Sequence, residues 1–145
     1  VLRRPPTARL FPYTTLFRSG QAVAEFLASH PKIAYVNYCG LPGDKYHAVA
    51  EKYLPNGSCG VVSFGVKGGR EAAAAFMGHL KIAAIETHVA DARTCCLHPA
   101  SSTHRQMNDE QLIAAGVQPD LVRMSCGLED KNDLIHDIAQ ALDQI

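Results

Sequence analysis

The sequence lacks the features of membrane, secreted and nucleic-acid-binding proteins. No apolar run approaches the roughly 18 residues that a membrane span needs, and no apolar signal core with a cleavage site stands near the amino terminus. Fourteen Lys and Arg balance fourteen Asp and Glu, so no net field draws the chain towards nucleic acid or anionic lipid. We therefore expect a cytoplasmic protein with no nucleic-acid partner and no membrane partner.

Several enzyme and metal-site motifs are also missing. The chain has no CxxC pair, no GxSxG elbow and no GxxxxGK[ST] loop, which argues against a zinc site, a serine hydrolase and a P-loop. Its five cysteines form an odd set without regular spacing, so we expect reduced thiols and no metal site. The composition, with 47% hydrophobic and 19% charged residues over 145 positions, is that of one globular domain.

Residues 1–19, VLRRPPTARLFPYTTLFRS, differ from the rest of the chain because they show no helical or strand period. The stretch FPYTTLFRS resembles a translated sequencing adapter joined to a truncated gene. We therefore interpret residues 1–19 as a non-native leader and residues 20–145 as the biological domain, whose true beginning is missing.

From residue 20 onward, hydrophobic periodicity predicts helices and strands in mixed order without an internal repeat. Helices are predicted at 20–30, after Asp44, at 70–80, between Asn108 and Gly116, and from about Asp130 to the end. Strands are predicted at 33–38, 60–67, 81–87, 93–97 and 121–127. This order favours an α/β (α+β) two-layer sandwich, with a mixed, partly antiparallel sheet of four to five strands and helices mainly on one face.

Arg123 is the most informative candidate for chemistry. The two-residue period of a strand puts Val122 and Met124 on an apolar face and Arg123 on the opposite face, among small residues. A guanidinium there presents a rigid fork of donors that matches a carboxylate in a bidentate manner. Two other arrangements remain open: an internal ion pair with an acidic residue, or an arginine on an open sheet face. The acidic candidates are Asp91, Glu129 and Asp130.

Three other segments invite a functional interpretation. Thr94 follows an acidic loop, where its hydroxyl and nearby amides can add a second contact to the anion bound by Arg123. The segment 98–104, HPASSTH, has hydroxyls and two histidines but no acid at a diagnostic spacing, so we interpret it as a pocket-lining loop. The glycines of the segment 65–69, GVKGG, are explained by a tight turn into a helix.

The combined motifs resemble a known family. AVAEFLASHPKIAYVNYCGLP, YHAVAEKYLPNGSCGVVSFGVKGG, HVADARTCCLHPASSTHRQ and AAGVQPDLVRMSCGLEDKNDLIHDIAQAL are similar to the carboxy-terminal part of the pyridoxal-phosphate enzymes of cysteine and methionine metabolism. The resemblance covers about residues 20–145. Within the family, HVADART followed by HPASSTH is most similar to O-acetylhomoserine sulfhydrylases, also called aminocarboxypropyltransferases.

The resemblance implies a role for particular residues. The family's arginine in R-x-S-x-G-x-E-D binds the α-carboxylate of the amino-acid substrate, and the corresponding segment RMSCGLED places it at Arg123. The serine or threonine that supports the same carboxylate falls on Thr94. The implied fold is the small carboxy-terminal domain of fold-type I enzymes, and the implied assembly of the full-length enzyme is a homotetramer.

The resemblance also implies what this chain lacks. The cofactor, pyridoxal 5'-phosphate, is held in the family by a lysine of an earlier large domain, and that domain is missing here. We therefore expect no catalytic residue, no cofactor-binding residue and no activity in these 145 residues alone. We also expect an exposed apolar patch where the large domain would dock.

The implied reaction of the whole enzyme converts O-acetyl-L-homoserine and sulfide or methanethiol into homocysteine or methionine and acetate. One alternative is another enzyme of transsulfuration, such as a cystathionine lyase, a cystathionine synthase or a methionine lyase, because these share the carboxylate site. A second alternative is a non-catalytic module that recognises amino-acid carboxylates through Arg123.

Overall fold

The computed structural model describes residues 12–145. Helices and strands alternate along this part of the chain. Their bounds, in chain order, are α1 Pro12–Ser29, β1 Ile33–Asn37, α2 His47–Tyr53, β2 Val61–Val66, α3 Gly69–His79, β3 Ala84–Ile85, β4 Cys95–Leu97, the 3-10 turn η2 Pro99–Ser101, α4 Asp109–Ala114, β5 Leu121–Ser125 and α5 Lys131–Asp143. No described helix is both long and apolar enough to cross a membrane.

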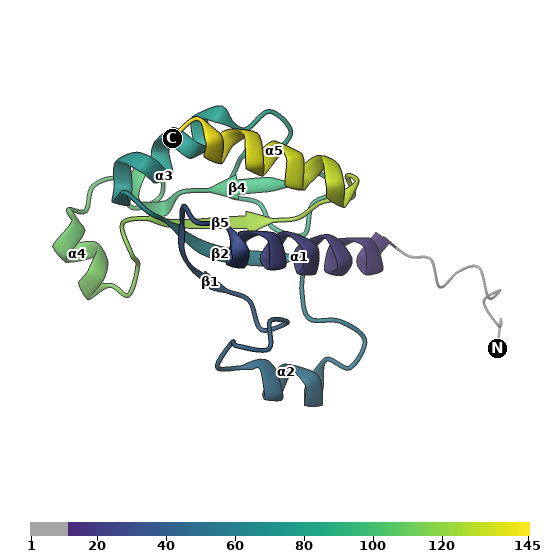
Figure 1. Ribbon diagram of the computed structural model, residues 1–145. Coiled ribbons are helices and arrows are strands. Elements are labelled where there is room, and N and C mark those ends of the chain that lie inside the picture. Colours follow the sequence, from purple (N-terminus) through teal and green to yellow (C-terminus); the bar gives the residue numbers. More distant parts are fainter. Residues whose placement is uncertain (1–11) are drawn as a thin grey trace, which may run out of the picture.

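The strands form one five-stranded sheet in the order β1-β2-β5-β4-β3. The pairs β1/β2, β2/β5 and β4/β5 are antiparallel, and β3/β4 is parallel. Helices α1, α3 and α5 form a layer on one side of this sheet (Figure 1). The predicted two-layer sandwich with a mixed sheet is therefore confirmed.

The core lies between the sheet and the helical layer. Phe64 of β2 and Phe76 of α3 are fully buried and meet edge to face, with ring centroids 5.8 Å apart. Their neighbours include Met124 of β5 and Ile138 of α5. Because apolar residues alternate along β2 and β5, burial of one strand face fixes which side of the sheet the helices cover.

Residues 12–19 are helical, whereas the interpretation of residues 1–19 as a non-native leader stays a prediction. Helix α1 begins at Pro12, and Leu16 and Ser19 are buried, with exposed fractions of 7% and 2%. The prediction that this stretch has no helical period is therefore wrong for residues 12–19, which continue the helix predicted from residue 20. Residues 1–11 of the interpreted leader lie outside the described residues.

Helix α2 differs in a second way from the expectation. Asp44 does not cap it: the Asp44 carboxylate accepts hydrogen bonds from the backbone N–H groups of Tyr38 and Tyr46, in the turn before the helix. Among the residues of α2, Ala50 is buried, whereas Val49 and Tyr53 are more than half exposed. Figure 1 shows α2 set apart from the helices that cover the sheet.

Local signals at the other helix ends are confirmed. Asn108 and Gln111 form a reciprocal capping box at the start of α4. Gly68 and Gly69 both have positive φ, at 107° and 74°, so the glycines before α3 serve a tight turn.

The segment before β3 is hydrogen-bonded to the carboxy-terminal helix α5. The carboxylate of Asp137, buried in α5, accepts hydrogen bonds from the backbone N–H groups of Lys81, Ile82 and Ala83. Three backbone N–H groups donate to this one carboxylate, so both the carboxylate and the three N–H groups have hydrogen-bond partners. This contact sets where the chain enters the strand pair that leads to the candidate site.

Candidate functional site

Arg123 lies near the middle of β5, the central strand of the sheet. Its cross-strand neighbours are Ser63 on β2 and Leu97 on β4. Val122 and Met124, on either side of it in sequence, are fully buried under the helices. Arg123 is partly exposed and projects from the opposite face, as the alternation predicts.

The guanidinium of Arg123 binds a backbone carbonyl instead of a carboxylate. Its Nη2 donates to the carbonyl oxygen of Thr87 at 2.7 Å. Its Nε is buried and has no hydrogen-bond partner in the described part of the chain. Such an unpaired buried donor is costly in a folded protein unless a ligand or water completes it.

The three acidic residues that were candidates for an internal pair are engaged elsewhere. Asp91 accepts from the backbone of Arg93, Glu129 accepts from Thr94, and Asp130 caps α5. Within residues 12–145, Arg123 therefore forms no ion pair.

Residues 86–94 form a loop that crosses β5 on the Arg123 side. The side chain of Ser125 accepts from the backbone N–H of Ala90 at 3.0 Å, and the carbonyl of Ala92 accepts from the backbone N–H of Leu128 at 2.7 Å. Ala90 has φ of 58°, the left-handed conformation that costs a non-glycine residue energy. The surrounding hydrogen bonds hold the loop in this strained form.

Thr94 closes the loop at its carboxy-terminal end. Its backbone N–H and its hydroxyl donate to the two carboxylate oxygens of Glu129, both at 2.8 Å, and its hydroxyl accepts from the backbone N–H of Gly127, also at 2.8 Å. Thr94 is fully buried. The structure thus joins Thr94 to the segment that follows Arg123, while the hydroxyl points to protein groups.

His88 directly follows Thr87 in the loop. Its Nδ1 lies 3.0 Å from a carboxylate oxygen of Glu86. The hydrogen bond to Glu86 raises the pKa of His88, and the charge of the same carboxylate adds to the shift. The imidazolium form is thereby favoured on an exposed part of the loop.

The 98–104 segment has a structural role. His98 is buried, its Nε2 lies 2.8 Å from the carbonyl oxygen of Pro119, and its Nδ1 lies 2.9 Å from the Ser101 hydroxyl. Because a carbonyl can only accept, Nε2 carries the proton and Nδ1 accepts from Ser101. Burial lowers the pKa of His98. A neutral carbonyl occupies the place of an orienting acid, so this pair does not have the arrangement of a hydrolase.

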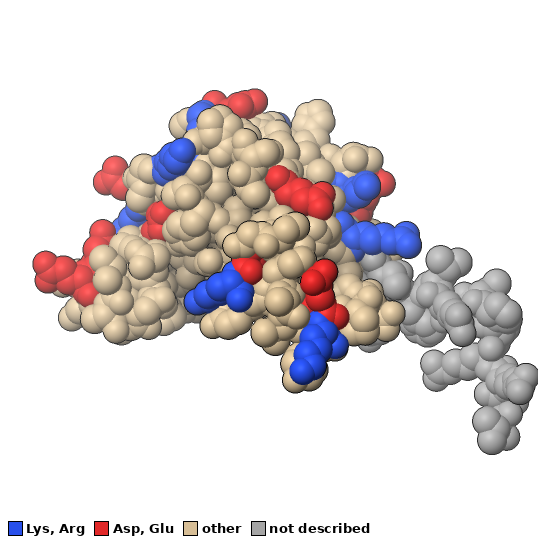
Figure 2. Space-filling view, turned by 60° about the horizontal axis from the view of Figure 1, so that its bottom comes forward, with Lys and Arg blue, Asp and Glu red and all other residues tan. Residues whose placement is uncertain are grey.

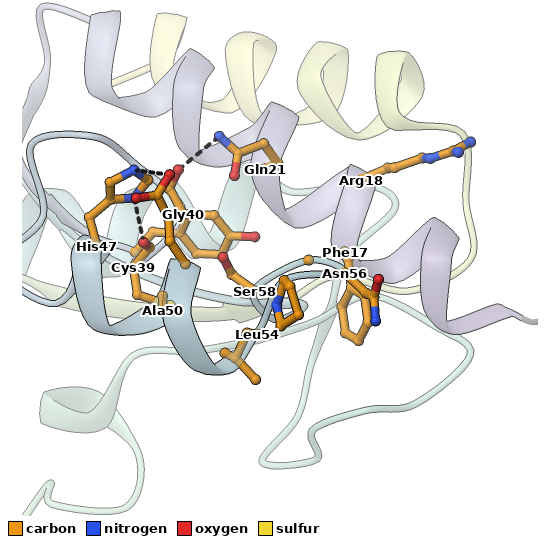
Figure 3. Close-up of a pocket in the computed structure, with 14 residues that line it drawn as sticks. Phe17, Arg18, Gln21, Cys39, Gly40, His47, Ala50, Leu54, Asn56 and Ser58 are labelled. Atoms are coloured by element: carbon orange, nitrogen blue, oxygen red, sulfur yellow. Dashed lines mark hydrogen bonds and ion pairs between the residues drawn. The ribbon is translucent and has the colours of Figure 1, made fainter.

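A cavity of about 520 Å³ lies elsewhere, between α1 and α2 (Figure 3). Three of the polar side chains on its wall are paired with other wall residues. His47 contacts the Cys39 carbonyl at 3.0 Å and Glu51 at 3.6 Å, and Gln21 donates to the Gly40 carbonyl at 3.3 Å. Since these groups do not converge on a common point in the cavity, Arg123 remains the better candidate site.

The charges on the face shown in Figure 2 give no second candidate. Figure 2 shows Lys and Arg side chains interspersed with Asp and Glu side chains on the face in view. Groups of three or more potential metal ligands are absent from the described residues. All five cysteines are free, and Cys95, Cys96 and Cys126 are buried.

The lysines of the described residues do not form a cradle for pyridoxal 5'-phosphate. Lys32 donates to the carbonyls of Leu142 and Ile145 at the end of α5, and Lys67 donates to the carbonyl of Pro31. The remaining lysines are on the exposed surface: Lys45, Lys52, Lys81 and Lys131. These ammonium groups either bind backbone or face solvent, so a buried Schiff-base lysine is not among them.

Sequence reasoning located Arg123 and Thr94 but missed what surrounds them. The Thr87 carbonyl and the strained backbone of Ala90 carry no signal in a single sequence, because backbone groups are the same in every residue. Ser125 did carry a signal, since it lies two positions from Arg123 on the same strand face.

Comparison with known proteins identifies relatives over most of the chain. A model of the Cys/Met metabolism PLP-dependent enzyme family matches residues 14–143. The O-acetyl-L-homoserine sulfhydrylase of Leptospira meyeri is 45% identical over 130 residues, which are 88% of this chain and 29% of that protein. The homocysteine synthase of Schizosaccharomyces pombe is 44% identical over 84% of this chain and 28% of its own length.

A solved structure is also similar. It is the O-acetylhomoserine (thiol)-lyase of Campylobacter jejuni, which was solved with N'-pyridoxyl-lysine-5'-monophosphate. The two structures superpose with a TM-score of 0.83 at 34% sequence identity, and the match covers 91% of this chain and 31% of the Campylobacter chain. The present chain thus spans less than a third of the length of the curated relatives described above.

Proposed function

Because the chain belongs to the Cys/Met metabolism PLP-dependent enzyme family, we propose that it is the carboxy-terminal part of an O-acetylhomoserine sulfhydrylase. In this proposal the complete enzyme, a homotetramer, converts O-acetyl-L-homoserine and sulfide or methanethiol into homocysteine or methionine and acetate. The present residues supply the site for the α-carboxylate of the amino acid. The names of the sulfhydrylase and synthase relatives support the choice of reaction.

The observation that carries the proposal is the state of the Arg123 guanidinium. It stands on the open face of the central strand, forms no ion pair among the described residues, and keeps a buried Nε without an acceptor. One Nη2 hydrogen is anchored on the Thr87 carbonyl, and the remaining Nη hydrogens can donate to a carboxylate. Anchoring limits the rotation of the side chain, which lowers the entropy lost when substrate binds.

Exposed apolar residues next to the Arg123 loop support a larger partner surface. Val89 and Leu128 are 50% and 42% exposed, and they belong to the loop and to the segment that follows β5. Large apolar side chains in such a position favour contact with further protein. We propose that the part of the polypeptide that the relatives possess in addition covers this side and completes the substrate site.

Pyridoxal 5'-phosphate acts as an electron sink when it is bound in enzymes of this family. The described lysines do not fit its attachment site, so we place the cofactor on the part of the enzyme that this chain does not contain. The residues of this chain act by binding and orienting the substrate carboxylate.

A direct contact between Thr94 and the substrate stays a prediction. Its hydroxyl already donates to Glu129 and accepts from Gly127. A substrate carboxylate would have to displace Glu129 to gain that donor.

The test of the proposal is a chimera in which residues 20–143 replace the matching third of the Leptospira meyeri sulfhydrylase. The chimera should turn over O-acetyl-L-homoserine with sulfide, and Arg123→Lys should raise KM for O-acetyl-L-homoserine about 10- to 100-fold, as expected for loss of a bidentate charged pair. KM for sulfide should change little. The same change at the exposed Arg105, Arg105→Lys, serves as a matched control.

Different outcomes separate the alternatives. Turnover of cystathionine or methionine in preference to O-acetyl-L-homoserine would assign another reaction of the family. An unchanged KM in the Arg123→Lys chimera would remove Arg123 from the carboxylate site.

For the 145-residue chain alone we expect no stable visible absorbance band after mixing with pyridoxal phosphate. A band abolished by a single lysine substitution would show that the chain holds the cofactor itself.

A further inference from the structure

Four alternate residues of one segment face the loop 86–94. Arg123 binds the Thr87 carbonyl, Ser125 binds the Ala90 N–H, and Glu129 binds Thr94. Gly127, between Ser125 and Glu129, donates its N–H to the Thr94 hydroxyl. The segment RMSCGLED therefore makes a row of hydrogen bonds along the loop, and Arg123 is its first member.

Gly127 also permits the close approach of the loop. A Cβ at this position would collide with the backbone N of Thr94, the backbone O of Ala92 and the carboxylate of Glu129. Each of these groups belongs to the row of contacts or to the loop itself. The spacing of the row thus depends on a residue without a side chain as well as on the three polar side chains.

The loop needs this support because it has little structure of its own. Residues 86–94 lie outside the helices and strands, Ala90 is in the left-handed conformation, and Thr87, Val89 and Ala92 are exposed. A loop with few buried apolar contacts has a low cost of local opening. If it opened, the Thr87 carbonyl would move and the anchored edge of Arg123 would be free to rotate.

We infer that Thr94, Glu129 and Ser125 are positioning residues, which hold the loop 86–94 so that the Thr87 carbonyl fixes the guanidinium of Arg123 for carboxylate binding. This inference rests on the proposed function of Arg123. It assigns Thr94 an indirect role: its hydroxyl joins Glu129 to Gly127 and does not reach the substrate. Among these residues, Arg123 is the one that contacts the substrate carboxylate in this inference.

The experiment compares Thr94→Val with Thr94→Ser. Valine has a similar shape and loses the hydroxyl, whereas serine keeps the donor and the acceptor. In the chimera, Thr94→Val should raise KM for O-acetyl-L-homoserine about tenfold, the effect of one lost hydrogen bond to a charged group. KM for sulfide should stay constant, and Thr94→Ser should restore the original KM. Ser125→Ala, a milder change, should raise KM about threefold.

A double-mutant cycle separates positioning from direct binding. If Thr94 acts through Arg123, Thr94→Val should cause no further rise of KM in an Arg123→Lys background, because the anchored fork is already lost. An equal rise in both backgrounds would show that Thr94 binds the substrate independently and would overturn the inference. A fall in kcat with unchanged KM would overturn it as well, since it would indicate a general loss of structure.

A readout without turnover covers the case in which a chimera fails to fold. In nuclear magnetic resonance spectra of the 145-residue chain, the buried Arg123 Nε–H should give a slowly exchanging signal that shifts on addition of acetate. Thr94→Val should speed its exchange and weaken the shift, and Thr94→Ser should not. A signal unchanged by Thr94→Val would overturn the inference, whereas a signal indifferent to acetate in every variant would count against the carboxylate site itself.

Discussion

The two faces of β5 are stabilised by different kinds of interaction. On one face Val122 and Met124 are fully buried under α3 and α5 in a continuous apolar core. On the other, Arg123 and Ser125 hold a strained loop through individual hydrogen bonds. Apolar burial is non-directional and scales with area, whereas hydrogen bonds depend on the position of each atom. The first face therefore secures the fold, and the second fixes the geometry of the candidate site.

The largest difference should appear when one residue is removed from each face. Phe76→Ala should lower the free energy of unfolding by about 3–5 kcal/mol, because it leaves a cavity against Phe64 in the apolar core. Arg123→Met should change it by less than about 1 kcal/mol, because a costly unpaired donor disappears together with one hydrogen bond. Urea unfolding of both variants measures the difference; equal losses would contradict the division between the faces.

A smaller effect, at the end of β4, concerns pH. Burial lowers the pKa of His98 in the folded chain below its ordinary value. As pH falls below about 6.5 the unfolded chain takes up a proton that the folded chain does not, so stability should fall by at most about 1.4 kcal/mol per pH unit.

His98→Gln should flatten this dependence in the window below the ordinary histidine pKa, because glutamine does not titrate. The control is His136→Gln on the exposed side of α5, which makes the same substitution away from the buried imidazole. The measurement is the unfolding midpoint as a function of pH in this window. If the pH dependence persists in His98→Gln, a group other than His98 causes it.

The smallest effect should come from the loop itself. Ala90→Gly should raise the free energy of unfolding by about 0.5 kcal/mol, because glycine relieves the left-handed strain and the gain exceeds the added entropy of the unfolded chain. Ala92→Gly, in the same loop but without positive φ, should lower it by a similar amount. Denaturant midpoints of the two variants should therefore shift in opposite directions, and a parallel shift would show that strain at Ala90 is negligible.

Much of the fold was predictable because its signals are local. The five strands fall within the predicted ranges, and the capping box at Asn108 and Gln111 is present. Alternation along residues 121–126 placed Val122 and Met124 in the core and Arg123 on the opposite face. Each of these features depends on residues within a few positions of one another.

The errors have one physical cause, which is contact with distant parts of the chain. We predicted no helix for residues 12–19, yet they are helical, and Leu16 packs against Gly60. Asp44 is placed correctly to cap a helix but binds the backbone of Tyr38 instead. In both cases the local sequence allowed more than one structure, and the tertiary contact selected among them.

The sequence by itself determined the order of helices and strands, the buried face of the sheet and the presence of a guanidinium on the opposite face, because these follow from periodicity along the chain. Only the tertiary structure decided what that guanidinium meets. The Thr87 carbonyl lies 36 residues from Arg123, and Thr94 lies 35 residues from Glu129. Every residue has a backbone carbonyl, so the sequence does not show which carbonyl binds Arg123. The folded position of the loop over the strand decides it.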